Sequence, residues 1–203
     1  MMDDFKIEKG PFIDEELKAV AILHRQSISM GFLSQLGDGF LFYLYKSMSE
    51  CDRSILIVAK CGDDVVGFIA GSMGLGPVYK HLLRHYFVGV VFTLIPNMVS
   101  LSKLKRIVET LLYSKGCGDI EVSPPGELLS LAVNGDFRRT GVAKKLTLEL
   151  VKQFKEKGLD VLKIIVGQEL LGAQRFYQKM GAVKSGMIEV HKGSKSFVYR
   201  LDF

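Results

Sequence analysis

Residues 127–143, ELLSLAVNGDFRRTGVA, decide the fold that this sequence adopts. Residues 127–133 are nearly all apolar, which is typical of a β-strand that is covered on both faces of its sheet. From residue 142 to residue 154 apolar side chains recur every three to four positions, which predicts a helix. A strand that enters a helix through a short loop can bind phosphate, because the first N–H groups of the helix have no partner within it and lie at the positive end of its dipole.

The loop between these two elements contains the residue types that such a site needs. Gly141 has no Cβ, so the backbone there can approach a ligand closely. Arg138 and Arg139 add positive charge. The sequence therefore predicts an anion-binding loop at the start of the helix.

A second strand and a second helix follow, and together the two units resemble the GNAT superfamily of acetyltransferases. Arg138-x-x-Gly141-x-Ala143 resembles the family signature R/Q-x-x-G-x-G/A. Residues 173–182, AQRFYQKMGA, resemble the family's A-x-x-F-Y-x-x-x-G-F segment in order and spacing. The resemblance covers roughly residues 127–182.

Two positions depart from the family pattern. Leu170 stands where the family often has Asn, so a polar contact near the cofactor is missing. Ala182 stands where the family has Phe, which changes the packing after Gly181. Neither departure removes the residues that are expected to hold the cofactor.

The resemblance implies an α/β (α+β) GNAT fold, in which helices flank a mixed sheet of about six to seven strands that splays apart at the cofactor strands. We expect one domain over residues 1–203, with a helical insertion at about 77–116. Asp14 is expected to be the N-cap of the first helix. Further strands are predicted at 5–8, 54–60, 65–73, 161–166, 183–190 and 196–202, and further helices at 33–48 and 170–180.

The resemblance also implies where the co-substrate acetyl-CoA would bind. Its pantetheine arm would pair with the backbone of the first buried strand, and its pyrophosphate would lie on the amides at the start of the following helix. No metal is expected. The residues implied in cofactor binding are Leu131, Ala132, Val133, Arg138, Arg139, Thr140, Gly141, Val142, Ala143, Ala173 and Phe176.

Two side chains are catalytic candidates by resemblance. Tyr177 would protonate the departing thiolate, although it also lies on an apolar helical stripe and is open to interpretation as a core residue. Glu127 stands five residues before Ala132, where the histone-acetylating branch of the family has a glutamate base. The alternative for Glu127 is a solvated acid at the start of a strand.

Composition limits the class of protein. Three cysteines, an odd number without metal-like spacing, favour reduced thiols and a cytoplasmic location. The longest apolar run, residues 86–95, is too short to span a membrane. His81 and His85 are four residues apart, but no third ligand is evident, and His24 is expected to be structural.

The net charge of +5 is concentrated in residues 77–116, which contain six basic residues and one acid. Three interpretations of this segment stay open: a lid that binds an anionic acceptor, a peripheral membrane surface, or a homodimer interface or additional core. We expect residues 86–95 to be buried against another surface, because so apolar a run is rarely left exposed. Lys103, Lys105 and Arg106 fall within about one helical turn.

The expected function is transfer of an acetyl group from acetyl-CoA directly to a primary amine of a small molecule such as an amino sugar. The alternatives are acetylation of a protein or peptide amine, and a non-catalytic CoA-binding or membrane-surface module. No nucleic-acid partner is expected.

Overall fold

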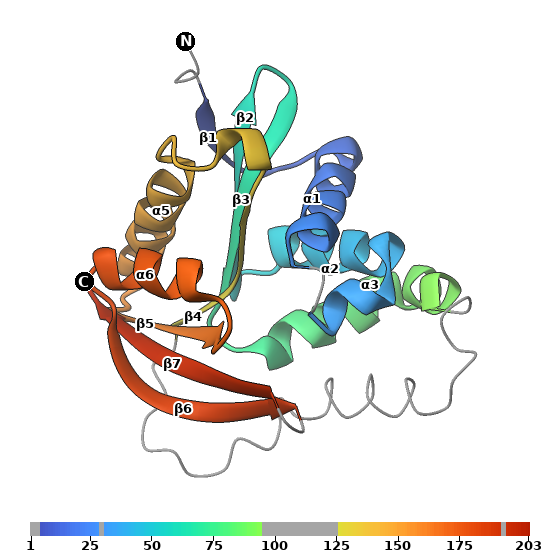
Figure 1. Cartoon of the computed structure of the whole chain (residues 1–203). Coiled ribbons are helices and arrows are strands. Elements are labelled where there is room, and N and C mark those ends of the chain that lie inside the picture. The colour runs from blue at the N-terminus through green and yellow to red at the C-terminus, as the bar shows by residue number, and fades with distance from the viewer. Residues whose placement is uncertain (1–4, 29–30, 95–125, 192–193) are drawn as a thin grey trace.

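The computed structural model describes residues 5–28, 31–94, 126–191 and 194–203 (Figure 1). Within these ranges seven strands form one mixed sheet in the order β1-β2-β3-β4-β5-β7-β6. All neighbouring strands are antiparallel except β4 and β5, which are parallel. The strands are β1 (Lys6–Lys9), β2 (Ser54–Cys61), β3 (Asp64–Ser72), β4 (Gly126–Val133), β5 (Val161–Gly167), β6 (Val183–His191) and β7 (Ser194–Asp202).

Helices cover both faces of the sheet. α1, α2 and α3 lie on one face, and α5 and α6 lie on the other (Figure 1). This arrangement confirms the expected GNAT architecture. The described helices are α1 (Asp14–Ser27), α2 (Asp38–Glu50), α3 (Leu75–Leu94), α5 (Val142–Glu156) and α6 (Leu171–Lys179), with short 3-10 helices η1 (Leu33–Leu36) and η3 (Gly135–Phe137).

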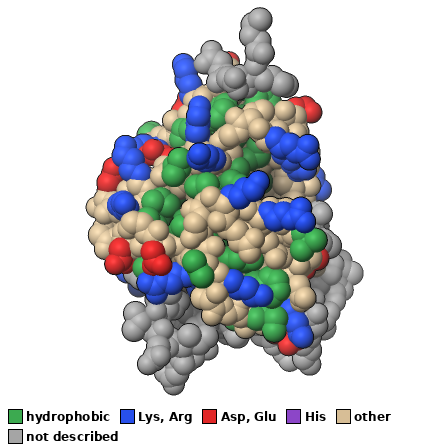
Figure 2. All heavy atoms as spheres, turned by 60° about the vertical axis from the view of Figure 1, so that its left-hand side comes forward, with side chains coloured by type: hydrophobic (Ala, Val, Ile, Leu, Met, Phe, Trp, Pro, Cys, Tyr) green, Lys and Arg blue, Asp and Glu red, His purple; other side chains and the backbone are tan. Residues whose placement is uncertain are grey.

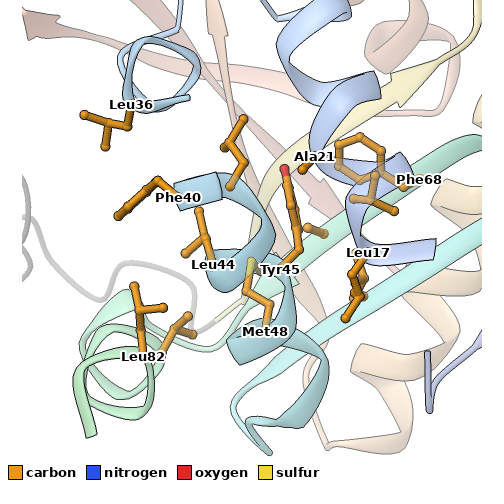
Figure 3. Packing of buried hydrophobic residues seen from close by; sticks show 14 of the residues in the cluster. Leu17, Ala21, Leu36, Phe40, Leu44, Tyr45, Met48, Phe68 and Leu82 are labelled. Atoms are coloured by element: carbon orange, nitrogen blue, oxygen red, sulfur yellow. The ribbon is translucent and has the colours of Figure 1, made fainter. Parts of the chain in front are cut away.

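The core on the α1–α3 face is built around aromatic side chains. Figure 3 shows Tyr45 projecting from α2 toward Phe68 of β3 and toward α1. The Tyr45 and Phe68 rings meet edge to face, with their centroids 5.1 Å apart. Leu17 of α1 and Leu82 of α3 complete the same cluster, so three helices share one buried apolar layer against the sheet.

The core on the opposite face depends on two glycines of β3. A Cβ at Gly67 would lie 2.9 Å from the side chain of Val142, and one at Gly71 would lie 2.9 Å from the side chain of Phe154. Both neighbours belong to α5 and are fully buried. The glycines therefore allow α5, which carries the predicted anion-binding loop at its start, to pack closely on the sheet.

We expect Gly71→Ala to destabilise the protein by about 1–3 kcal/mol, because the added methyl group overpacks a filled core. Chemical denaturation measures the change in the free energy of unfolding. Gly186→Ala is the matched control, since Gly186 is an exposed strand residue with no atom within 4 Å of its added Cβ. Equal stability of the two variants would contradict the close packing of α5 on β3.

Two sequence expectations need correction. The predicted helix at 33–48 is divided into η1 and α2, because Gly37 adopts a left-handed φ of 87° between them. Asp14 is the first residue of α1 rather than its N-cap, which is Ile13. The Asp14 carboxylate instead accepts a hydrogen bond from Lys46 Nζ at 2.7 Å and so joins α1 to α2.

His24 of α1 is 2% exposed, and burial lowers its pKa from 6.5 to about 4. The unfolded chain therefore binds a proton between these two pH values while the folded protein does not. Neutral His24 therefore makes its full contribution to the free energy of unfolding above pH 6.5, and this contribution decreases as the pH falls toward 4. We expect a loss of about 3 kcal/mol over this range.

Denaturation curves from pH 7 to pH 4, for the wild type and for His24→Asn, measure this contribution. The variant has no imidazole to protonate, so its stability should decrease less steeply with falling pH. Identical slopes for the two proteins would show that His24 keeps an ordinary pKa in the fold.

Candidate functional site

The sheet opens between its two parallel strands. β4 pairs with β5 only at Gly126, Glu127 and Leu128, whose partners are Leu162, Lys163 and Ile164. Beyond Leu128, β4 continues to Val133 paired with β3, and β5 continues paired with β7. The two strands therefore separate at their C-terminal ends, which is the splay that the family resemblance implied.

A β-bulge marks the point where β4 leaves β5. Ala70 pairs with Ser130 whereas Gly71 pairs with Leu128, so Leu129 is an additional residue on β4. A bulge bends its strand and increases the local twist, which accounts for the divergence. No Gly or Pro stands at Leu129, so the sequence offers no local signal for this bulge.

The loop after β4 has its own hydrogen bonds. Asn134 Oδ1 accepts a bond from the Asp136 N–H at 3.2 Å, and Thr140 Oγ1 donates to the Phe137 carbonyl at 2.7 Å. Arg138 Nε donates to the Val133 carbonyl at 3.3 Å and so ties the loop to the end of β4. These bonds hold the loop without using the amides that begin α5.

The start of α5 is open to an anion. Arg139 and Gly141 have left-handed φ values of 67° and 93°, and the N-cap Gly141 provides no capping side chain. A Cβ at Gly141 would meet no atom within 4 Å. The first N–H groups of α5 thus lack a capping partner from a protein side chain, and the N-cap residue is open to a ligand, which is the arrangement that favours phosphate.

Positive charge surrounds this loop. Arg138, Arg139, Lys144 and Lys145 are all exposed there. Figure 2 shows Lys and Arg side chains spread over the face that includes α5 and α6. A polyanionic ligand would therefore be attracted to this side of the molecule.

The family model of the acetyltransferase (GNAT) family matches residues 99–182, a range that contains the strand, the loop and both helices of this site. Over these residues the chain is similar to the acetyltransferase (GNAT) family. No curated protein sequence matches the chain.

Solved N-acetyltransferase structures share the fold over nearly the whole chain. An N-acetyltransferase from Staphylococcus aureus Mu50 is 13% identical with a TM-score of 0.62, covering 98% of each chain. PaiA N-acetyltransferase from Thermoplasma acidophilum, in complex with coenzyme A, is 16% identical with a TM-score of 0.57, covering 98% of this chain and 99% of that one. The ribosomal-protein-S18-alanine N-acetyltransferase from Escherichia coli is 11% identical with a TM-score of 0.58, covering 98% of this chain and 94% of that one. At these identities the likeness shows the fold.

Tyr177 of α6 lies on the same face of the sheet as α5 (Figure 1). It is 5% exposed, and its ring meets Phe176 edge to face at 5.1 Å. Its hydroxyl has no hydrogen-bond partner among the residues that the structure describes. Burial raises the pKa of Tyr177, so the phenol keeps its proton at neutral pH. The side chain is thus both a core residue and a protonated acid.

Gln174, which the sequence analysis did not single out, fixes α6 to the end of β5. It is buried, and its Nε2 donates to the carbonyls of Gly167 at 3.1 Å and Gln168 at 2.8 Å. Ala173 and Phe176 on the same helix pack against the α5 core. The position of Tyr177 relative to the gap is therefore set by bonds from Gln174 to the strand.

Glu127 lies at the closed end of the gap. It faces Lys163 across the paired part of β4 and β5, and its carboxylate is 2.9 Å from Lys163 Nζ. The sequence analysis weighed a base against a solvated acid, and the structure adds a third interpretation, an ion pair that fixes the two strands together. Arg138 and the ten other residues that are predicted to bind the cofactor lie in four places. These are the open part of β4, the loop, the start of α5, and α6.

Other expectations concern α3 and the histidines. Val90 and Leu94 are buried in the core, whereas Phe87, Val88 and Phe92 are 58%, 65% and 68% exposed, so within a single chain the expected burial of residues 86–95 is seen for part of the described run only. Lys103, Lys105 and Arg106 lie outside the described residues. His81 and His85 stack on each other with their ring centroids 4.3 Å apart.

No group of three or more His, Cys, Asp or Glu side chains within the described ranges could hold a metal ion. None of the helices in those ranges has the length and apolar character needed to cross a bilayer.

Proposed function

We propose that this protein transfers the acetyl group of acetyl-CoA directly to a primary amine of low pKa on a small molecule such as an amino sugar. The opening between β4 and β5, which ends at the uncapped start of α5, is the observation that supports this proposal. It provides an extended strand edge for a pantetheine arm and a helix start for a pyrophosphate at the same end of the sheet.

The chain's own residues would divide the binding of acetyl-CoA between them. The backbone of Leu131, Ala132 and Val133, which has no partner on β5, would pair with the amides of the pantetheine arm. The amides of Arg139 to Ala143 would bind the pyrophosphate, and Arg138 would hold the loop against β4. An N–H group in the unpaired part of β4 would polarise the thioester carbonyl.

The reaction needs a neutral amine and a proton for the leaving group. The amine nitrogen forms a bond to the carbonyl carbon, the carbon–sulfur bond breaks, and the electron pair leaves on the CoA sulfur. Tyr177 would donate its proton to this thiolate, and the proton that the nitrogen loses would restore the phenol. The net products are the amide and free CoA thiol, with no covalent enzyme intermediate.

The acceptor amine is expected to have a low pKa, because the carboxylate of Glu127 is paired with Lys163 and is not available as a base to deprotonate it. A lysine-like amine with a pKa of about 10.4 costs roughly 4.6 kcal/mol to deprotonate at pH 7. An amine with a pKa near 8 costs roughly 1.4 kcal/mol. Acceptors of the second kind, such as amino sugars, therefore suit this site.

A peptide α-amine is the second candidate acceptor, because its pKa is also about 8. The fold is shared with the Escherichia coli enzyme named for the alanine of ribosomal protein S18, which supports this alternative. A non-catalytic CoA-binding or membrane-surface module is less well supported, since the loop at Gly141 and the protonated Tyr177 are both present.

A thiol-release assay with acetyl-CoA tests the proposal. The acceptors would be glucosamine, a peptide with an N-terminal alanine, a lysine peptide blocked at its N-terminus, and spermidine. We expect release with glucosamine or the α-amine peptide and little with the blocked lysine peptide. Fastest release with the blocked lysine peptide would contradict the low-pKa acceptor, and no release with any amine would overturn the proposed catalysis.

A further inference from the structure

A row of buried polar side chains runs from α1 through α2 to β4. His24 Nδ1 lies 2.5 Å from the hydroxyl oxygen of Tyr45, and the Ser130 hydroxyl makes a hydrogen bond with Tyr45. The three residues are 2%, 1% and 8% exposed. A polar chain of this kind inside an apolar core costs desolvation energy, so its position calls for an explanation.

The row ends at the opening of the sheet. Ser130 directly follows the bulged Leu129 and stands two residues beyond the last β4–β5 pair, which is Leu128 with Ile164. Its bond to Tyr45 of α2 places its side chain on the α1–α3 face, where Leu129 and Ala132 also pack. The anion-binding loop leads to α5 on the opposite face (Figure 1).

Ser130 therefore borders the gap from the face opposite the proposed cofactor loop. A thioester would reach the open part of β4 from the α5 face of the sheet, and the attacking amine would approach it from the face of α1 and α2. The Ser130 hydroxyl is the polar group that this part of β4 presents on that face, between apolar neighbours Leu129 and Leu131.

The chemistry of the three groups sets the direction of their hydrogen bonds. A phenol is a better donor than a neutral imidazole N–H, and an imidazole nitrogen is a better acceptor than a phenol oxygen. Burial lowers the pKa of His24 to about 4 and raises the pKa of Tyr45, so both groups are neutral at pH 7. His24 Nε2 has no hydrogen-bond partner in the described structure, so the bond at Nδ1 decides the tautomer.

We therefore assign the Tyr45 O–H as donor to His24 Nδ1, and the Ser130 O–H as donor to Tyr45. In this arrangement the hydroxyl proton of Ser130 is donated to Tyr45, so toward a ligand Ser130 Oγ can act only as a hydrogen-bond acceptor. If His24 were no acceptor, Tyr45 would donate to Ser130, and Ser130 would then present its proton instead.

We propose that Ser130 Oγ accepts a hydrogen bond from an N–H of the attacking amine, and that Tyr45 and His24 are positioning residues that keep Ser130 an acceptor. The bond would hold the amine with its lone pair directed at the thioester carbonyl. This inference rests on the proposed function and adds a residue to its acceptor side. The row orients the amine. Tyr177 still protonates the CoA sulfur, and the proton that the amine loses still restores the Tyr177 phenol, as described above.

Ser130→Ala removes the acceptor alone. We expect kcat/KM for the best amine of the panel to decrease by about tenfold or more, since a buried donor on the amine would lose its partner. The dissociation constant for CoA should stay within twofold of wild type. Ser47→Ala is the matched control, because Ser47 is a fully buried serine of α2 that bonds to the Val78 carbonyl at 3.1 Å, away from β4.

Variants of His24 separate a positioning role from a structural one. His24→Asn keeps an oxygen acceptor near the position of Nδ1 and should retain kcat/KM within about threefold, whereas His24→Leu should reproduce the loss of Ser130→Ala. The double variant Ser130→Ala/His24→Leu should show no further loss, because the two residues act through one bond. Tyr45→Phe replaces His24→Leu in this cycle if the latter does not fold.

Wild-type kcat/KM in Ser130→Ala, or additive losses in the double variant, would overturn the role of Ser130 while leaving the proposed acetyl transfer in place. A wild-type protein that binds CoA by calorimetry and acetylates no amine would instead overturn the proposed function, and the role of Ser130 with it.

Discussion

Gly141→Glu should reduce the affinity for CoA by about 100-fold or more, because it places a carboxylate beside the pyrophosphate at the start of α5. The φ of 93° at Gly141 disfavours any side chain, but no atom lies within 4 Å of an added Cβ. The substitution therefore introduces local backbone strain and a negative charge without a clash in the core. Isothermal titration calorimetry with CoA measures the affinity.

Gly158→Glu controls for the strain and the charge. Gly158 follows the other end of α5, has a left-handed φ of 78°, and likewise has open space around an added Cβ. It should lose a similar amount of stability and retain its affinity for CoA. Equal affinities of Gly141→Glu and the wild type would show that CoA does not bind across this loop.

The parts of the site that the sequence predicts well are those with a local signal. The apolar run at 127–133, the helical period at 142–154 and Gly141 between them are all encoded within a few residues, and the structure has β4, the loop and α5 at these positions. The loop's left-handed φ at Gly141 is likewise a property of the residue itself.

The parts that were missed depend on residues far apart in the sequence. The ion pair of Glu127 with Lys163 exists because the register of β4 on β5 places them side by side. The contact of His24 with Tyr45 depends on how α1 packs on α2, and periodicity alone shows only that His24 lies on a buried face. Register and helix packing are set by the whole core, so no short motif predicts them.

Tyr177→Phe should lower kcat by about 100-fold while leaving CoA affinity within twofold of wild type, because only the proton donor is removed. The ring would still pack against Phe176. The hydroxyl has no partner among the described residues, so its loss should leave no buried group unpaired and should cost little stability. Single-turnover measurements of thiol release report the chemical step apart from product release.

Tyr199→Phe distinguishes a catalytic hydroxyl from a structural one. Tyr199 of β7 lies in the same core, is 1% exposed, and its hydroxyl reaches Gln174 Oε1 of the same helix at 3.5 Å. Removing this hydroxyl loosens α6 but takes no acid from the gap, so it should affect the melting temperature more than the single-turnover rate. If Tyr177→Phe behaves like Tyr199→Phe, then Tyr177 is a core residue, and water in the gap would be left as the proton donor to the thiolate.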